Sequence, residues 1–136
     1  MDNDLFVLRE VSEEIVKARL AVYRKFVGAV VALAVAGKTQ PSRANQNAIN
    51  NLLREIMPDI VLVGSRQTHA AFVEIRGAAE DGQTLGIVFA IERLMAAMRA
   101  DIGIVDDEMN QGDLLRVFIK DIDDALVFFS VMKVGG

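Results

Sequence analysis

The sequence predicts an all-α domain: a bundle of five or six helices with a long first helix as its spine. Apolar residues recur at alternating steps of three and four along most of the 136 residues, which is the period of an α-helix. Capping residues and glycines stand where these periodic segments would begin and end. We expect one domain, residues 1–136, because a chain of this length buries enough surface to fold without a metal or a disulfide.

The first helix is expected from Leu5 to Ala36. Its second half, from Val27 onward, is apolar almost all round, so we expect neighbours on several sides there. Gly37 would end the helix, because glycine readily adopts the left-handed conformation found at helix ends. One face carries the three-four repeat, formed by Leu8, Val11, Ile15, Ala18, Val22, Phe26, Ala29, Leu33 and Ala36.

The second helix follows a proline-serine pair. Ser42 would cap it, and an apolar stripe repeats at helical spacing from Ala48 to Met57. Pro58 lacks the N–H that a helix interior needs, so residues 60–63 form either a kinked continuation or a short strand. We favour the kinked helix.

The third and fourth helices each have a cap. Ser65 would begin a helix that runs through Ala79, although residues 72–76 alternate well enough to form a strand. Asp81 would cap the fourth helix, which ends before Gly103. The stripe of the fourth helix consists of Leu85, Val88, Ile91, Met95 and Met98.

The C-terminal part shows mixed signals. Asn110 and Asp113 resemble a capping box, and helical spacing continues to Ile122, which predicts a fifth helix. Residues 125–132 are rich in strand formers but keep the three-four rhythm. A short strand or a sixth helix is therefore possible at the C-terminus, and we favour the helix.

Three motifs occur in a recognisable order: Pro41-Ser42, Leu62-Val63-Gly64-Ser65 and Met98-Arg99-Ala100-Asp101-Ile102-Gly103. Over about residues 15–120 this order resembles an uncharacterised bacterial all-helical domain whose mark is a Met-Arg-x-Asp-x-Gly helix end. The resemblance implies an all-helical fold and brings no known activity. Pro58 and the tail after Asp124 depart from that pattern.

Composition excludes several functions. The 15 Lys+Arg against 19 Asp+Glu, with one Tyr and no Trp, argue against nucleic-acid binding. The absence of cysteine excludes thiol chemistry and zinc-thiolate sites. An acidic start is unlike a secretory signal, and the apolar run from Phe26 to Gly37 is shorter than the roughly 20 residues of a membrane span. We expect a cytoplasmic protein without a membrane segment.

One pair of glutamates raises the question of a metal. Glu10 and Glu13 form a Glu-x-x-Glu of the kind that holds Mg²⁺ in helical nucleotide pyrophosphohydrolases. The second pair would be Glu55 and Asp59, which has the wrong spacing and contains Pro58. We predict no metal and keep a small metal-dependent nucleotide hydrolase as the alternative function.

No other pattern indicates catalysis. His69 is the only histidine, and Ser65 one turn before it does not build a nucleophile, base and orienting group. The ten glycines form no phosphate-binding loop. We therefore predict no catalytic residues and no cofactor.

Arg99 and Asp101 are the candidate ligand or structural pair. An arginine in the last turn of a helix, before a glycine stop, complements the negative end of the helix dipole. We favour the structural role for both residues.

A hydrophobic content of 52% and a mean hydropathy of +0.31 are high for a soluble domain of this size, which indicates apolar surface beyond the needs of one core. We predict a non-enzymatic helical interaction module that works as a homodimer or bound to another protein. An inhibitor or immunity-type protein is a further alternative. The expected interface consists of Val22, Phe26, Ala29 and Leu33.

Overall fold

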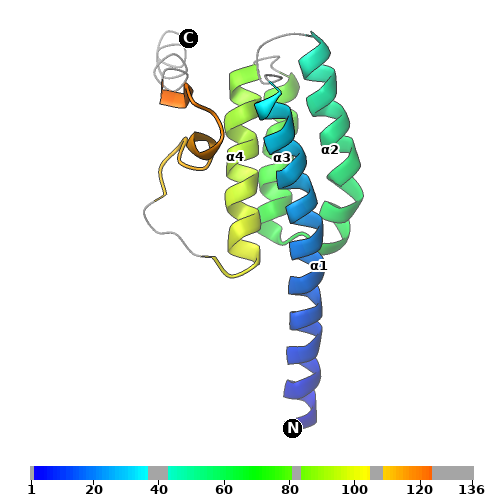
Figure 1. Cartoon of the computed structure of the whole chain (residues 1–136). Helices are drawn as coiled ribbons and strands as arrows, with labels where there is room; N and C mark the ends of the chain where they lie inside the picture. Colours follow the sequence, from blue (N-terminus) through cyan, green and yellow to red (C-terminus); the bar gives the residue numbers. More distant parts are fainter. Residues whose placement is uncertain (1, 37–42, 81–83, 105–108, 124–136) are drawn as a thin grey trace.

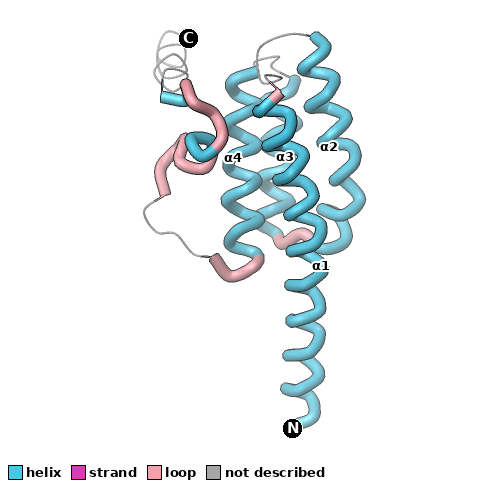
Figure 2. The backbone as a smooth tube through the Cα atoms, viewed as in Figure 1, coloured by secondary structure: helices cyan, strands magenta, loops and turns pink. Residues whose placement is uncertain are grey.

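The computed structural model describes residues 2–36, 43–80, 84–104 and 109–123. This part of the chain contains four α-helices and no strand (Figure 2). The all-α prediction is confirmed there, and the described residues show four helices where five or six were expected for the chain. The elements are α1 (Asp2–Val35), α2 (Arg43–Val63), α3 (Arg66–Glu80), α4 (Thr84–Asp101) and a single 3-10 turn, η1 (Leu115–Val117).

The helices form a bundle in which consecutive helices run in opposite directions (Figure 1). Contacts join α1 to α2, α2 to α3, α3 to α4 and α4 back to α1, so each helix touches two neighbours. From Ile87 to Glu92 every residue of α4 is buried. This stretch of α4 is therefore enclosed on several sides, whereas the next residue, Arg93, is exposed.

The core draws on all four helices. Ile75, Ile87, Phe89 and Leu94 are 0% exposed. Burying an aliphatic or aromatic side chain of this size contributes about 1.5–3 kcal/mol relative to leaving it exposed. None of the described helices is long and apolar enough to cross a membrane.

The two halves of α1 have different surroundings. The C-terminal half runs beside the other helices, where Tyr23, Phe26 and Val30 are buried. The N-terminal half extends beyond them (Figure 1), and residues 12–18 are all exposed. The bundle therefore covers only part of the long helix.

The structure settles two alternatives in favour of helix. α2 continues through Pro58 to its end at Val63, with Ile60 buried at 3% exposure. Residues 72–76 lie within α3, where Phe72 and Ile75 are buried and Val73 is 67% exposed. Burial at a spacing of three is what a helix produces, whereas a strand would bury alternate residues.

The predicted fifth helix is wrong. The local signal is present, because the N–H of Asn110 donates to Oδ2 of Asp113 at 2.8 Å, as in one half of a capping box. Gly112, however, has a φ of 95°, which is incompatible with a regular helix, and between residues 113 and 121 the structure contains only the single turn η1. The C-terminal element expected at residues 125–132 and the caps expected at Ser42 and Asp81 lie outside the described residues.

Candidate functional site

The end of α4 positions both members of the Arg99 and Asp101 pair. The N–H of Ile104 donates to the carbonyl of Arg99 at 2.9 Å, and the N–H of Gly103 donates to the carbonyl of Ala100 at 3.0 Å. With Gly103 at a φ of 92°, this is a Schellman ending, and the predicted glycine stop is confirmed.

Asp101 lies where α1, α3 and α4 meet. Its Oδ2 accepts hydrogen bonds from the Tyr23 hydroxyl at 2.7 Å, the Thr68 hydroxyl at 2.8 Å and the Ser65 N–H at 3.2 Å. The N–H of Ser65 belongs to the first turn of α3, where the helix dipole favours a negative charge. Asp101 therefore joins the end of α4 to two other helices.

These contacts shift two pKa values in opposite senses. Burial of Asp101 opposes ionisation, but the hydrogen bonds from Ser65, Tyr23 and Thr68 outweigh it and hold the pKa of this carboxyl below its usual range. Burial and the neighbouring Asp101 carboxylate raise the pKa of the Tyr23 hydroxyl. At neutral pH, Asp101 is therefore an ionised carboxylate, and it accepts the hydrogen bond that the neutral Tyr23 hydroxyl donates.

Ser65 caps α3 as predicted, since its Oγ accepts the N–H of Thr68 at 3.2 Å. The preceding end of α2 is closed by two side chains from elsewhere. Nε2 of His69 donates to the carbonyl of Ile60 at 2.6 Å, and Nε of Arg19 donates to the carbonyl of Val63 at 2.5 Å. His69 thus satisfies a helix end.

Gly64, between α2 and α3, fits this corner because it has no side chain. A Cβ at that position would lie 2.7 Å from the carbonyl oxygen of Ile60 and 3.1 Å from the ring of His69. The sequence contains no local signal for this close approach, because it depends on how the chain turns back on itself.

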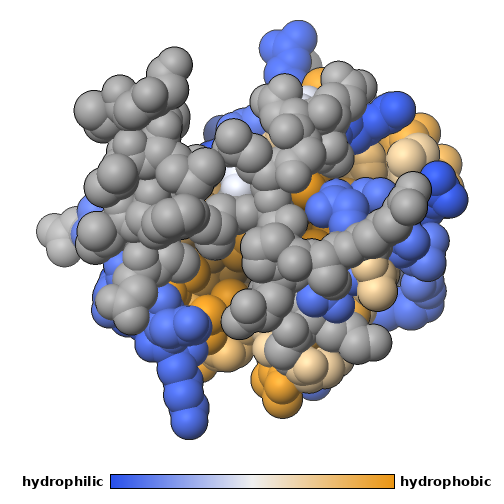
Figure 3. All heavy atoms as spheres, turned by 90° about the horizontal axis from the view of Figure 1, so that it is seen from above, coloured by the Kyte–Doolittle hydropathy of each residue, from blue (hydrophilic) through white to orange (hydrophobic). Residues whose placement is uncertain are grey.

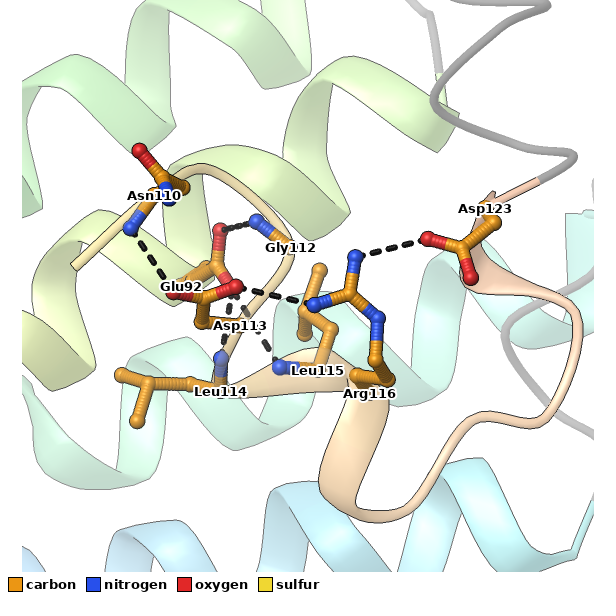
Figure 4. Close-up of polar contacts among 8 residues, drawn as sticks. All are labelled: Glu92, Asn110, Gly112, Asp113, Leu114, Leu115, Arg116 and Asp123. Carbon is orange, nitrogen blue, oxygen red and sulfur yellow. Dashed lines mark hydrogen bonds and ion pairs between the residues drawn. The ribbon is translucent and has the colours of Figure 1, made fainter.

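Glu92 holds the C-terminal segment against the bundle (Figure 4). Its Oε1 accepts the N–H of Gly112 at 2.7 Å, and its Oε2 accepts the N–H groups of Leu114 at 3.1 Å and Leu115 at 3.2 Å. Glu92 is 5% exposed, so these amides have a buried charged acceptor in place of water. Sequence analysis did not single out this residue, which looks like any glutamate on a helix.

A groove of about 580 Å³ lies between α1, α4 and the C-terminal segment. We use "the groove" for the space bounded by Leu20, Tyr23, Arg24, Val27, Gly28, Val31, Met95, Met98, Arg99, Ile102, Ile104, Leu114, Val117 and Phe118. The view from above shows apolar side chains exposed among the hydrophilic ones that surround them (Figure 3). The volume falls in the range of about 300–1,000 Å³ that is typical of small-molecule sites.

The predicted site residues fall into different surroundings. Arg99 lines the groove, whereas the carboxylate of Asp101 takes up the three hydrogen bonds described above. Of the four residues expected at an interface, Phe26 is 2% exposed in the core, and the other three pack against that core partly buried: Val22, Ala29 and Leu33. All four contribute to the packing of a single chain.

Nothing in the described residues favours a metal centre, because no three His, Asp or Glu side chains meet in a geometry that could hold an ion. Glu13 lies on α1, and Glu55 and Asp59 lie on α2. Glu55 instead forms an exposed ion pair with Lys25 at 3.6 Å.

The chain matches no family model, no curated protein and no solved structure. The resemblance to a bacterial all-helical domain therefore stays a prediction.

Proposed function

We propose that this chain is a non-enzymatic helical interaction module that self-associates through the projecting half of α1. The supporting observation is apolar surface on that half: Ile15, Val16 and Leu20 are 39%, 38% and 48% exposed. Leu8 and Val11 continue the same spacing in the sequence. Such a stripe is buried when a second helix packs along it.

A projecting helix benefits from a partner for a second reason. An isolated helix shorter than about 12–15 residues is marginal in water, because most helical stability in proteins comes from packing. Residues 12–18 are all exposed, and a neighbouring helix would supply additional packing.

The distribution of charge favours a second copy as this partner, in the antiparallel orientation. Glutamates gather in one stretch of α1, at Glu10, Glu13 and Glu14. Basic residues gather in the next stretch, at Lys17, Arg19, Arg24 and Lys25. Two copies side by side in opposite directions bring acidic stretches near basic ones, whereas parallel copies bring like charges together.

No comparable observation supports either alternative function. A metal-dependent nucleotide hydrolase would need a cluster of ligands, and the described residues provide none. An inhibitor or immunity-type protein rests on size and acidity alone.

Sedimentation velocity over a range of micromolar concentrations tests the proposal. We expect the mass of the wild type to rise to that of a dimer, and Ile15→Glu to remain monomeric, because burying an unpaired carboxylate costs several kcal/mol. The matched control is Val73→Glu, at an apolar residue that is 67% exposed on a different helix, α3. This control should dimerise like the wild type.

Salt tests the orientation. Attraction between opposite charges is screened, so raising the ionic strength should weaken an antiparallel dimer. A parallel dimer, with like charges adjacent, should be strengthened instead. A wild type that stays monomeric at high micromolar concentration, or equal effects of Ile15→Glu and Val73→Glu, would overturn the proposal.

A further inference from the structure

We infer that the groove binds a long-chain fatty acid, with the hydrocarbon chain along the apolar floor and the carboxylate held by Arg24 and Arg99. This inference goes beyond self-association and does not depend on it. It rests on the apolar lining of the groove, on the charge of the residues that line it, and on the way in which Leu114, Val117 and Phe118, its third wall, are held in place.

The floor of the groove suits a flexible hydrocarbon chain. Two methionines from α4, Met95 and Met98, contribute to it, and both are almost completely buried at 4% and 2% exposure. Methionine is unbranched and polarisable, so it adapts to an irregular apolar surface. Val27 and Val31 of α1 and Ile102 extend the same surface.

The charge of the groove suits an anion. Among the described residues that line it, the charged side chains are two arginines, Arg24 and Arg99, and no acidic residue lines it. The chain as a whole carries a formal charge of −4, so this is a local concentration of positive charge on an acidic protein. The planar guanidinium group offers paired donors that match a carboxylate.

The third wall of the groove is held in place from within the bundle. Leu114, Val117 and Phe118 form this wall, and the N–H of Leu114 is bonded to Glu92. Because Glu92 is buried and accepts three backbone N–H groups of this segment, the wall is fixed without a ligand. A preformed wall lowers the ordering cost of binding.

Two glycines provide a matched pair of variants. Gly28 lines the groove, and a Cβ added there would meet nothing within 4 Å. The Cβ of a leucine at this position would therefore be accommodated, and the rest of its side chain would occupy space in the groove that Gly28 lines. Gly77 of α3 has the same open space and does not line the groove. Both changes remove a glycine from a helix, so neither variant should melt below the wild type.

Binding is measured with cis-parinaric acid, a fluorescent fatty acid, below its micellar concentration, with displacement by palmitic acid. We expect saturable binding of one molecule per wild-type chain. Gly28→Leu should abolish this binding, and Gly77→Leu should bind like the wild type. Should Gly28→Leu fail to fold, as seen by circular dichroism, Val31→Phe enlarges another side chain that lines the groove and should give the same loss.

The role of the arginines has its own measurement. Arg24→Gln should bind palmitic acid about tenfold more weakly, which is the loss expected for a charged hydrogen bond. Methyl palmitate, which is neutral, should have the same dissociation constant for the wild type and for Arg24→Gln once displacement is corrected for the weaker binding of the probe acid to the variant. The inference is overturned if the wild type shows no saturable binding, if both glycine variants behave alike, or if Arg24→Gln leaves palmitic acid binding unchanged.

Discussion

Two carboxylates of α4, Glu92 and Asp101, each accept three hydrogen bonds, yet they do different things. All the donors to Glu92 are backbone N–H groups of one segment, residues 112–115, and Glu92 is 5% exposed. The donors to Asp101 come from separate elements, and two of the three are hydroxyl groups. Asp101 is only partly buried, so water can replace a lost partner there.

The comparison shows that the structural role of a carboxylate depends on how deeply it is buried. Glu92 determines the conformation of a segment that makes no regular helix, because it is the acceptor for the N–H groups of Gly112, Leu114 and Leu115. Asp101 joins helices whose formation does not depend on it, because each has its own apolar stripe. Removal of Glu92 should therefore change a conformation, whereas removal of Asp101 should weaken a connection.

The largest effect is expected for Glu92→Ala. This variant leaves the N–H groups of Gly112, Leu114 and Leu115 without their buried acceptor, at about 1–3 kcal/mol for each group that water does not reach. We expect a loss of about 3 kcal/mol in the free energy of unfolding, or detachment of residues 109–123. Urea unfolding measures the first outcome, and hydrogen exchange at those three amides measures the second.

Glu92→Gln is the control for that variant. It keeps the shape of the side chain and one carbonyl acceptor, so its loss should lie between those of the wild type and of Glu92→Ala. A Glu92→Ala protein with wild-type stability and protected amides would show that the segment is held by its apolar contacts instead.

A smaller effect is expected for Asp101→Ala. The variant removes the common acceptor of Tyr23, Thr68 and Ser65, but Asp101 itself is only partly buried, so we expect a loss of about 1–2 kcal/mol. Thermal melting should show a lower Tm, with residues 109–123 still protected from exchange. If residues 109–123 lost their protection from exchange, Asp101 and Glu92 would not differ in structural role.

The pH dependence of stability sharpens the comparison further. The pKa of Asp101 is lower in the folded protein, so its contribution is present above the unfolded value of about 3.9 and is lost as the pH falls through the folded value. The difference in Tm between the wild type and Asp101→Asn should therefore shrink as the pH is lowered from neutrality toward the folded-state pKa of Asp101. A constant difference between them would contradict the assignment.

The smallest effect is expected for Tyr23→Phe. One donor is lost from Asp101 while two remain, so the free energy of unfolding should fall by about 0.5–1 kcal/mol. The change should be non-additive with Asp101→Ala, because the two side chains share one bond. The raised pKa of Tyr23 means that the wild type loses this stabilisation as the pH rises above about 10, and Tyr23→Phe should not. Additive losses would show that the hydroxyl acts elsewhere.

The sequence predicted where along the chain the four helices lie. Their apolar residues repeat with the helical period, and the signals that bound them are local: Ser65 bonds to the N–H of Thr68, and Gly103 takes up the left-handed conformation. The sequence also identified Arg99, which lines the groove, and Asp101. Each of these features depends on residues within one or two turns of each other, which is the range that a periodic pattern describes.

The partner of an apolar stripe did not follow from the sequence. Phe26 and its neighbours carry the three-four repeat of an interface, but α2 and α4 of the same chain cover them. An apolar stripe on a helix predicts that another apolar surface packs against it, but it does not identify that surface. The groove residues Arg24 and Gly28 gave no signal for the same reason, since their surroundings come from α4 and from residues 114–118.

Tertiary structure alone decided the segment after α4 and the hydrogen bonds that organise the bundle. Asn110 and Asp113 make the local bond that should begin a helix. Gly112 turns away nevertheless, because its own N–H and those of Leu114 and Leu115 reach Glu92, twenty residues before Gly112 in the chain. Tyr23 and Asp101 are 78 residues apart in the sequence. Such bonds depend on which helices become neighbours, and a buried charge that gains or loses several hydrogen bonds outweighs the few tenths of a kcal/mol per residue by which sequences differ in helix propensity.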